Sequence, residues 1–288
     1  KSQEEYSTFL NLYDSFGYYV ADNELSKSYA AAYGVDTLYQ YMHDGLPNIA
    51  CEWPTTSYLN FTALTATAYS IFAPSNTAIN HFFDSFWKVG GYSSMQEVDE
   101  LALTYFLYQF IYGGSMLFPD ELGNDELKNV SGSTLKINPA MLNERIMCVN
   151  GAFYGMNEIQ DPSAFASVIG PVFQYKSARS FLYALVGSSL FSSYVSDLAK
   201  YIVLVPTAEQ FEASGIRTVY STQGLEAQGD DGWSEISSSA KQSIVYLHSA
   251  SIPSNQSSEL PESGTRVVLT ESPWNYWFVK DGTITCSS

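Results

Sequence analysis

The stretch YSIFAPSNTAINHFFDSFW, Tyr69 to Trp87, contains an abrupt change of pattern. Its apolar start predicts a strand that ends at Pro74, because proline cannot donate a hydrogen bond to a sheet. Ser75 or Asn76 can then cap a helix. From Ile79 onward the apolar residues recur three and four positions apart, as on one face of an amphipathic helix. The stretch therefore predicts a strand, a proline corner and a helix.

The same pattern returns in the second half of the chain. In YIVLVPTAEQF, which begins at Tyr201, a β-branched run meets Pro206, and Thr207 and Gln210 have the spacing of a helix capping box. The two corner prolines lie 132 residues apart (206 − 74). Solenoid repeats run to only about 20–50 residues. An offset this long therefore predicts a duplicated domain.

Two further landmarks keep this offset. Gly132 in SGSTLKI and Gly264 in ESGTRVV are 132 residues apart (264 − 132). Asn150-Gly151 and Asp281-Gly282 are hairpin signals, since both residue types tolerate positive φ, and their glycines are 131 apart (282 − 151). Helical patterns lie between the landmarks in each half. The order of elements predicts an α+β fold with mostly antiparallel strands and flanking helices.

The composition limits the classes of partner that the chain is expected to bind. The chain has 288 residues, 13 Lys and Arg against 30 Asp and Glu, and a net charge of −17. Nucleic acid and anionic membranes are therefore excluded as expected partners, because both attract basic clusters. Aromatic residues reach 15% of the chain, which leaves large amphipathic rings for a surface. The polar start KSQEEYS predicts that an N-terminal segment has been processed or omitted.

The sequence offers no catalytic or metal constellation. The three histidines, His43, His81 and His248, are scattered without metal-ligand spacing, and the three cysteines form no C-x-x-C pair. The acidic clusters PDELGNDE and QGDDGWSE lack the ligand alternation of an EF-hand and are interpreted as solvated loops. We therefore expect no enzyme activity, no cofactor and no intrinsic metal.

Several of these residues resemble the signatures of fasciclin-like domains. YSIFAPSNTAI is similar to the family's first signature, and YFLYQFIYGG resembles its Tyr-His element with Tyr108 kept and Gln109 in place of histidine. SAFASVIGPVF, Ser163 to Phe173, resembles the second signature, although Gly170 stands where the family has aspartate. In the second half, Tyr246 and His248 lie near the position of the Tyr-His element.

The resemblance implies two tandem fasciclin-like domains, each a β-sandwich-like wedge. The first is predicted at 1–174, with an insertion at about 23–65, and the second at 175–288. It also implies an extracellular adhesion or surface-interaction module without catalysis. The chain is broadly similar to tandem surface lipoproteins of Bacteroidetes, which implies a cell-surface location on an outer membrane through an N-terminal lipid anchor outside this chain.

The second domain is expected to be incomplete at its C-terminus. The first half continues 22 residues beyond Gly151 to Phe173 (173 − 151), through a predicted strand at 165–173, whereas the second continues only 6 beyond Gly282 (288 − 282). An incomplete sheet would leave an exposed edge open to a partner's strand. We therefore expect that the native chain runs on beyond Ser288; the alternatives are a strand supplied by another molecule and a shortened, capped sheet.

Six residues are the candidates for binding a surface protein, a matrix protein or a glycan. They are Tyr108, Gln109, Tyr246, His248, Trp53 and Trp233. Trp53 lies in the insertion, and insertions on a scaffold often carry its specific function. The alternative function is carbohydrate binding or processing, which the aromatic and acidic composition favours.

Overall fold

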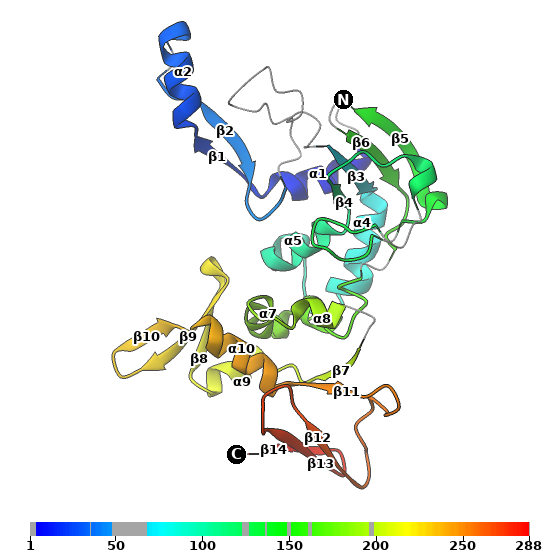
Figure 1. Cartoon of the computed structure of the whole chain (residues 1–288), viewed down its shortest axis with the longest axis vertical. Helices are drawn as coiled ribbons and strands as arrows, with labels where there is room; N and C mark the ends of the chain where they lie inside the picture. The colour runs from blue at the N-terminus through cyan, green and yellow to red at the C-terminus, as the bar shows by residue number, and fades with distance from the viewer. Residues whose placement is uncertain are drawn as a thin grey trace. The chain divides into compact units, whose positions relative to one another are not determined.

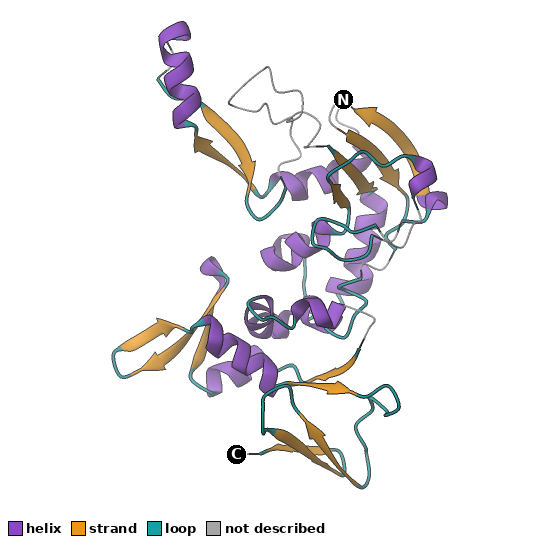
Figure 2. Cartoon of the chain, in the orientation of Figure 1, coloured by secondary structure: helices purple, strands orange, loops and turns teal. Residues whose placement is uncertain are grey.

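The computed structural model describes residues 4–34, 36–47, 68–122, 127–135, 137–148, 151–160, 163–195 and 199–287. It has the predicted α+β composition, with helices and mostly antiparallel strands (Figures 1 and 2). The chain forms two compact units, one of Lys1–Ser85 with Glu100–Pro162 and one of Phe86–Asp99 with Ser163–Ser288.

The first unit holds two sheets and four α-helices among its described residues. Its helices are η1 (Glu4–Tyr6), α1 (Ser7–Asp14), α2 (Asn23–Tyr33), α4 (Asn76–Phe82), α5 (Glu100–Tyr108), η4 (Pro119–Glu121) and η5 (Pro139–Met141). Its strands are β1 (Gly17–Ala21), β2 (Tyr39–His43), β3 (Tyr69–Pro74), β4 (Ile111–Gly113), β5 (Leu142–Cys148) and β6 (Gly151–Met156). The larger sheet has the order β4-β3-β6-β5, in which β3 and β6 are parallel.

The second unit adds the remaining elements. Its helices are η3 (Met95–Glu97), α6 (Gly170–Gln174), η6 (Lys176–Ala178), α7 (Arg179–Val186), α8 (Phe191–Val195), α9 (Ala208–Ala213), η7 (Tyr220–Thr222) and α10 (Ser238–Leu247). Its strands are β7 (Lys200–Val203), β8 (Ile216–Val219), β9 (Gly224–Gly229), β10 (Gly232–Glu235), β11 (Ser249–Ile252), β12 (Thr265–Leu269), β13 (Tyr276–Lys280) and β14 (Thr283–Cys286). The π-turn η2 (Phe83–Trp87) continues α4 from the first unit into the second.

Both proline corners form as predicted. The Ser75 side chain accepts a hydrogen bond from the Ala78 amide and caps α4. Thr207 and Gln210 form the predicted capping box at the start of α9. In the first unit α5 and then β4 come after the corner helix, whereas in the second unit the strands β8, β9 and β10 intervene before α10 and β11. In both units the strand that comes after the longer helix is antiparallel to the corner strand. The pairs are β3 with β4 and β7 with β11.

The second hairpin signal forms the predicted turn, whereas Gly151 of the first signal is already the first paired residue of β6 and Asn150 lies outside the described residues. Cys148 pairs with Gly151, and Lys280 pairs with Thr283. In the second turn Asp281 and Gly282 both have positive φ, 46° and 75°, as a two-residue hairpin turn requires. The units differ beyond this point. Strand β6 pairs with β3, whereas β14 lies in the separate sheet β12-β13-β14.

At Gly151 the backbone of β6 lies close to the backbone of β3. A Cβ atom there would lie 1.8 Å from the Tyr69 carbonyl oxygen, a backbone atom that only a shift of the sheet would move. We expect Gly151→Ala to lower the free energy of unfolding by about 1–3 kcal/mol, as overpacking does. Urea denaturation measures this. Gly187→Ala, whose Cβ would meet nothing closer than 3.7 Å, is the control. Equal urea midpoints for the two variants would contradict the prediction.

The predicted strand at 165–173 is wrong. The chain forms turns there and then α6, with Pro171 in its first turn, where the fixed φ of proline suits a helix start. Phe165 stacks on Phe173 with ring centroids 4.9 Å apart, which requires the chain to fold back. The expectation of an incomplete second domain rested on that strand and loses this basis.

The segment 86–99 packs against the part of the second unit that follows residue 162. The Trp87 indole donates to the Phe173 carbonyl at 3.1 Å, and the Lys176 amide donates to the Gly90 carbonyl at 3.0 Å. The domain boundary predicted at residue 174 was inferred from the spacing of the repeated landmarks and not from these contacts. It stays a prediction.

Candidate functional site

The insertion predicted at 23–65 overlaps a pair of strands, β1 and β2, of which β1 begins before residue 23. Strands β1 and β2 pair antiparallel from Gly17 with His43 to Ala21 with Tyr39, and α2 lies between them in the chain. We call residues 17–43 the tyrosine ribbon (Figure 1). The rest of the predicted insertion, from residue 48 onward, lies outside the described residues.

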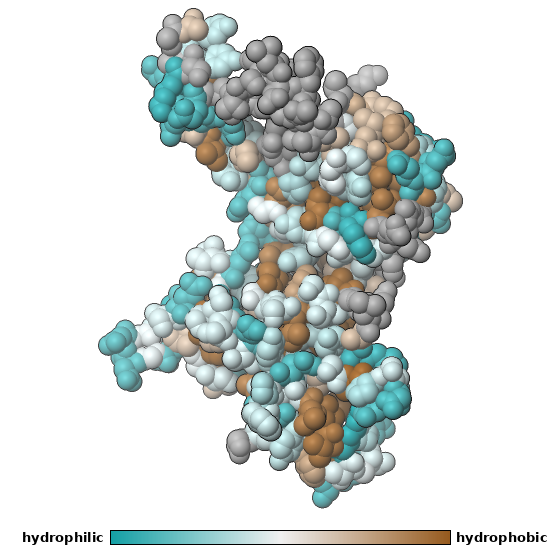
Figure 3. Space-filling model, viewed as in Figure 1, coloured by the Kyte–Doolittle hydropathy of each residue, from teal (hydrophilic) through white to brown (hydrophobic). Residues whose placement is uncertain are grey.

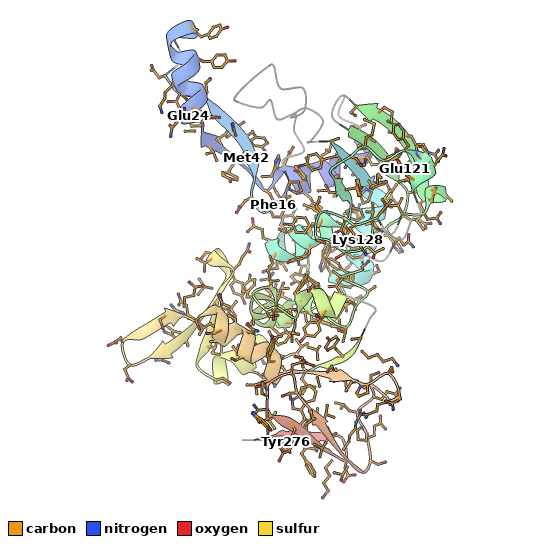
Figure 4. The ribbon with its side chains drawn as sticks, viewed as in Figure 1. Phe16, Glu24, Met42, Glu121, Lys128 and Tyr276 are labelled. Atoms are coloured by element: carbon orange, nitrogen blue, oxygen red, sulfur yellow. The ribbon has the colours of Figure 1, made fainter. Side chains whose placement is uncertain are left out.

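Asp22 fixes α2 to the strands. Its carboxylate accepts from the Glu24 amide at 3.1 Å, which caps the helix, and also from the Gln40 side chain on β2. The Ser26 hydroxyl accepts from the Leu38 amide at 2.9 Å. Figure 4 labels Glu24 and Met42 on these elements. The helix start and the return strand therefore share one polar junction.

An aromatic ladder runs along one face of the tyrosine ribbon. Tyr19 packs on Tyr41 and Tyr41 on His43, each at 5.0 Å between ring centroids, and His43 packs on Tyr13 of α1 at 4.2 Å. Tyr41 also covers Gly17, where a Cβ atom would lie 1.9 Å from the Tyr41 hydroxyl oxygen. The ladder ties the exposed strands to buried His43 and Tyr13.

The outer tyrosines of the ribbon are open to solvent. Tyr19 and Tyr33 are each 71% exposed and Tyr39 is 62% exposed. Such rings contribute nothing to the core. Tyrosine presents a large flat apolar surface and a hydroxyl at little entropic cost, which is why it is enriched in binding surfaces. The ribbon can therefore stack rings on a partner and donate hydrogen bonds at the rim.

The predicted binding residues Tyr108 and Gln109 lie at the end of α5 in the first unit. The half-buried Tyr108 hydroxyl donates to the Gly45 carbonyl, and burial raises the pKa of this hydroxyl. Gln109 is buried and accepts from the Asn129 side chain at 3.2 Å. Asn129 in turn orders the turn at Ser131. These contacts are internal, so Gln109 offers no surface to a partner.

Tyr246 and His248 lie at the end of α10 in the second unit, both half-buried. Gln242 donates to the Tyr246 hydroxyl at 2.6 Å, and the His248 Nδ1 atom lies 2.7 Å from the Ile244 carbonyl oxygen, which caps the helix end. The two side chains are thus engaged within the unit. Their role in binding stays a prediction.

Trp233 lies on β10 in a three-stranded sheet of order β10-β9-β8. The Arg217 guanidinium covers one face of its indole at 4.4 Å, and Glu226 binds the same guanidinium at 2.6 Å. One ring face is therefore already occupied by a cation. Asp230 and Asp231 form the hairpin turn between β9 and β10, as exposed charges. Trp53 lies outside the described residues.

A buried polar cluster lies between segment 86–99 and α7. Tyr183 donates to the carboxylate of Asp99, and Arg179 reaches that carboxylate at 3.9 Å. Arg179 also lies between the rings of Tyr92 and Tyr220, at 5.2 and 5.3 Å from their centroids. Burial and the Asp99 carboxylate raise the pKa of Tyr183, so the hydroxyl stays protonated. The cluster holds two segments of the unit together.

Among the described residues, no group of three or more His, Cys, Asp or Glu side chains is arranged to hold a metal ion. His81 is exposed, and His43 lies in the aromatic ladder with Asp14 at 3.5 Å. The expectation of no catalysis and no cofactor stays a prediction.

Sequence reasoning named the tyrosine-rich insertion but only Trp53 within it. The ribbon tyrosines were passed over because the spacing of tyrosines along a strand does not tell which rings are exposed. The signal available was the pair of short runs rich in tyrosine, GYYVA and YQYMH, because aromatic residues of this kind are enriched in strands.

No family model matches this chain, and neither does any curated protein. The chain is similar to a FAS1 domain pair. That solved structure is described as a novel fold from the insect cell adhesion molecule Fasciclin I. The two chains share 13% identity, over 78% of this chain and 83% of the other, with a TM-score of 0.27. A TM-score this low does not establish a common fold.

None of the helices in the described ranges combines the length and the apolar character that a membrane span needs.

Proposed function

We propose that this chain is an extracellular interaction module of the adhesion type, without catalytic activity, and that it binds its partner through the tyrosine ribbon. The observation that carries this proposal is the exposure of Tyr19, Tyr33 and Tyr39 on a ribbon whose base is packed into the first unit. Rigid, exposed rings are the side chains that dominate binding energy at protein interfaces.

The proposal extends to architecture. Two tandem fasciclin-like domains fit the shared order of corner, helix and antiparallel strand in the two units, together with the sequence signatures. The polar cluster of Asp99, Arg179 and Tyr183 supports the proposal that the chain is not catalytic. Its side chains bind one another within their own unit. A cell-surface location and a lipid anchor follow from the family resemblance alone.

The first test is adhesion by a chain with the ribbon tyrosines changed. We expect Tyr19→Ser, Tyr33→Ser and Tyr39→Ser together to reduce adhesion of chain-coated beads to a basement-membrane protein extract at least tenfold, since loss of a central interface ring costs about 2 kcal/mol. The thermal unfolding temperature should stay near that of the unchanged protein, because the buried contact of His43 with Tyr13 at the base of the ribbon is kept.

The matched control carries phenylalanine at the same three positions, which keeps the rings and removes the hydroxyls. It should retain most of the adhesion. Equal adhesion by the serine variant and the unchanged protein would exclude the ribbon as the binding surface. Failure of the unchanged protein to adhere would count against the adhesion function itself.

A glycan array tests the alternative of carbohydrate binding. Trp233 offers only part of its indole, because Arg217 covers one face. Binding to a glycan that Trp233→Ala abolishes and the ribbon variant does not would favour the alternative.

A further inference from the structure

The sheet β12-β13-β14 has apolar residues on both faces. On the inner face Val268, Trp277 and Val279 are buried in the core of the second unit, with Ile202 and Ile252. The outer face carries large apolar side chains that are exposed. They are Val267, Leu269, Tyr276 and Phe278, with Trp274 in the turn that precedes β13. We call these five residues the outer face.

The outer face is one continuous surface. Val267 is directly opposite Phe278, and Leu269 is directly opposite Tyr276, so the four side chains form two adjacent columns. Figure 3 shows hydrophobic side chains gathered over β12 and β13, and Figure 4 labels Tyr276 there. An ordinary sheet with one buried face alternates apolar and polar residues. This alternation is absent from β13 between Tyr276 and Val279.

Trp274 occupies a position that folding alone would give to glycine. The Asn275 amide donates to the Ser272 carbonyl at 3.2 Å, closing a turn in which Pro273 and Trp274 are the central residues. Trp274 has a φ of 69°, which the third residue of such a turn adopts when it is glycine or asparagine. Trp274 is 97% exposed, so packing of its side chain within the chain does not offset the cost of the strained backbone.

We propose that the outer face is a self-association surface, and that its occupant is the outer face of a second copy of this chain. Large aromatic side chains present about 150–250 Å² each, so the five residues at their exposures offer on the order of 600 Å². Patches larger than a few hundred Å² mark interaction sites, and about 800 Å² per partner makes a standard interface.

The outer face is complementary to itself. Tyr276, Phe278 and Lys280 alternate with buried Trp277 and Val279 along β13. Exposed Trp274 lies in the turn before the strand, so the indole and the exposed ammonium group of Lys280 lie at opposite ends of β13. In a face-to-face dimer whose twofold axis runs across the strands, the two copies of β13 are antiparallel, so the end near Trp274 in one copy meets the end near Lys280 in the other. Lys280 of each copy then lies over Trp274 of the other, an arrangement that cation–π attraction favours.

The chemistry of the face favours a protein surface over a glycan. The rings of Tyr276 and Phe278 have Leu269 and Val267 beside them, and aliphatic side chains cannot hydrogen-bond sugar hydroxyls. A partner surface that is equally apolar and flat can pack against both pairs of side chains, Val267 with Phe278 and Leu269 with Tyr276. A second copy supplies one by construction.

Net charge opposes this association and sets its salt dependence. Each copy carries a charge of −17. Raising the salt from about 0.1 M to about 1 M shortens the screening length from about 10 Å to about 3 Å and weakens the repulsion. The dimer should therefore become tighter with salt, the reverse of an interface built on ion pairs.

Sedimentation velocity of the whole chain over a range of concentrations tests the proposal. We expect a reversible dimer that tightens at high salt. Trp274→Gly should weaken association at least tenfold and at the same time leave the thermal unfolding temperature equal or higher, because glycine relieves the positive φ. A residue needed only for folding would shift stability in the opposite direction. Leu269→Lys should also weaken association, by adding charge to the face.

Val89→Lys is the matched control, because Val89 is an exposed apolar residue of the same unit outside this sheet. It should dimerise like the unchanged protein. A chain that sediments as a monomer at every concentration and salt would overturn the proposal. So would a dimer that survives both Trp274→Gly and Leu269→Lys, since another surface would then be responsible. Neither outcome bears on adhesion through the tyrosine ribbon.

Discussion

Replacing Asp99 by alanine is expected to lower the free energy of unfolding of the second unit by about 3–5 kcal/mol. The Asp99 side chain is only 5% exposed, and its carboxylate accepts from Tyr183 and faces Arg179 at 3.9 Å. Removing one partner of a buried pair leaves the other charge uncompensated, which is the main part of the cost. Segment 86–99 also loses one of its contacts with α7, while the bond from Arg179 to the Glu97 carbonyl remains.

Urea denaturation of Asp99→Ala measures this loss, and Asp99→Asn is the matched control. Asparagine keeps an acceptor for Tyr183 and nearly the same volume, so the difference between the two variants isolates the charge opposite Arg179. Tyr183→Phe should cost only about 1–2 kcal/mol, as for one buried hydrogen bond. An unchanged urea midpoint for Asp99→Ala would show that the pair does not support the fold.

Alkaline pH is expected to destabilise the chain steeply above about pH 10. Burial raises the pKa of both Tyr183 and Tyr194 above the ordinary value of about 10. An unfolded tyrosine releases its proton near pH 10, whereas the folded one retains it. The unfolded state therefore binds fewer protons, and the free energy of unfolding falls as pH rises.

The slope is about 1.4 kcal/mol per pH unit for each such tyrosine, so two of them remove several kcal/mol between about pH 10 and pH 12. Urea denaturation across this range, with tyrosinate absorbance as a second signal, measures the effect. Tyr183→Phe should reduce the slope by the share of one tyrosine. A free energy of unfolding that stays constant from pH 9 to pH 12 would contradict the prediction.

Features that depend on neighbours in the chain could be predicted from the sequence. Thr207 and Gln210 form a capping box because four consecutive residues contain both partners. Asp281 and Gly282 form the hairpin turn because their own backbone preferences suit positive φ. Both proline corners and the α+β class follow from the same local rules.

Features that depend on distant segments could not be predicted. Gln109 looks like a polar surface residue, yet Asn129 meets it in the interior. The strand expected at 165–173 came from the resemblance to the second fasciclin signature, but Phe165 stacks on Phe173 and the segment forms turns and a helix. The tyrosine ribbon lay in a segment that the sequence marked as an insertion, but which of its rings are exposed depends on pairing across the ribbon.

The interleaved path of the chain has a consequence for its synthesis. Asp99 leaves the ribosome 84 residues before Tyr183, the residue that holds it. At about 5–20 residues per second, roughly 4–17 seconds pass in which segment 86–99 has no binding site. Trp87, fully buried in the finished protein, likewise precedes by 86 residues Phe173, whose carbonyl accepts from its indole. The nascent chain therefore passes through a stage in which the Trp87 ring lacks this partner and is available to a chaperone.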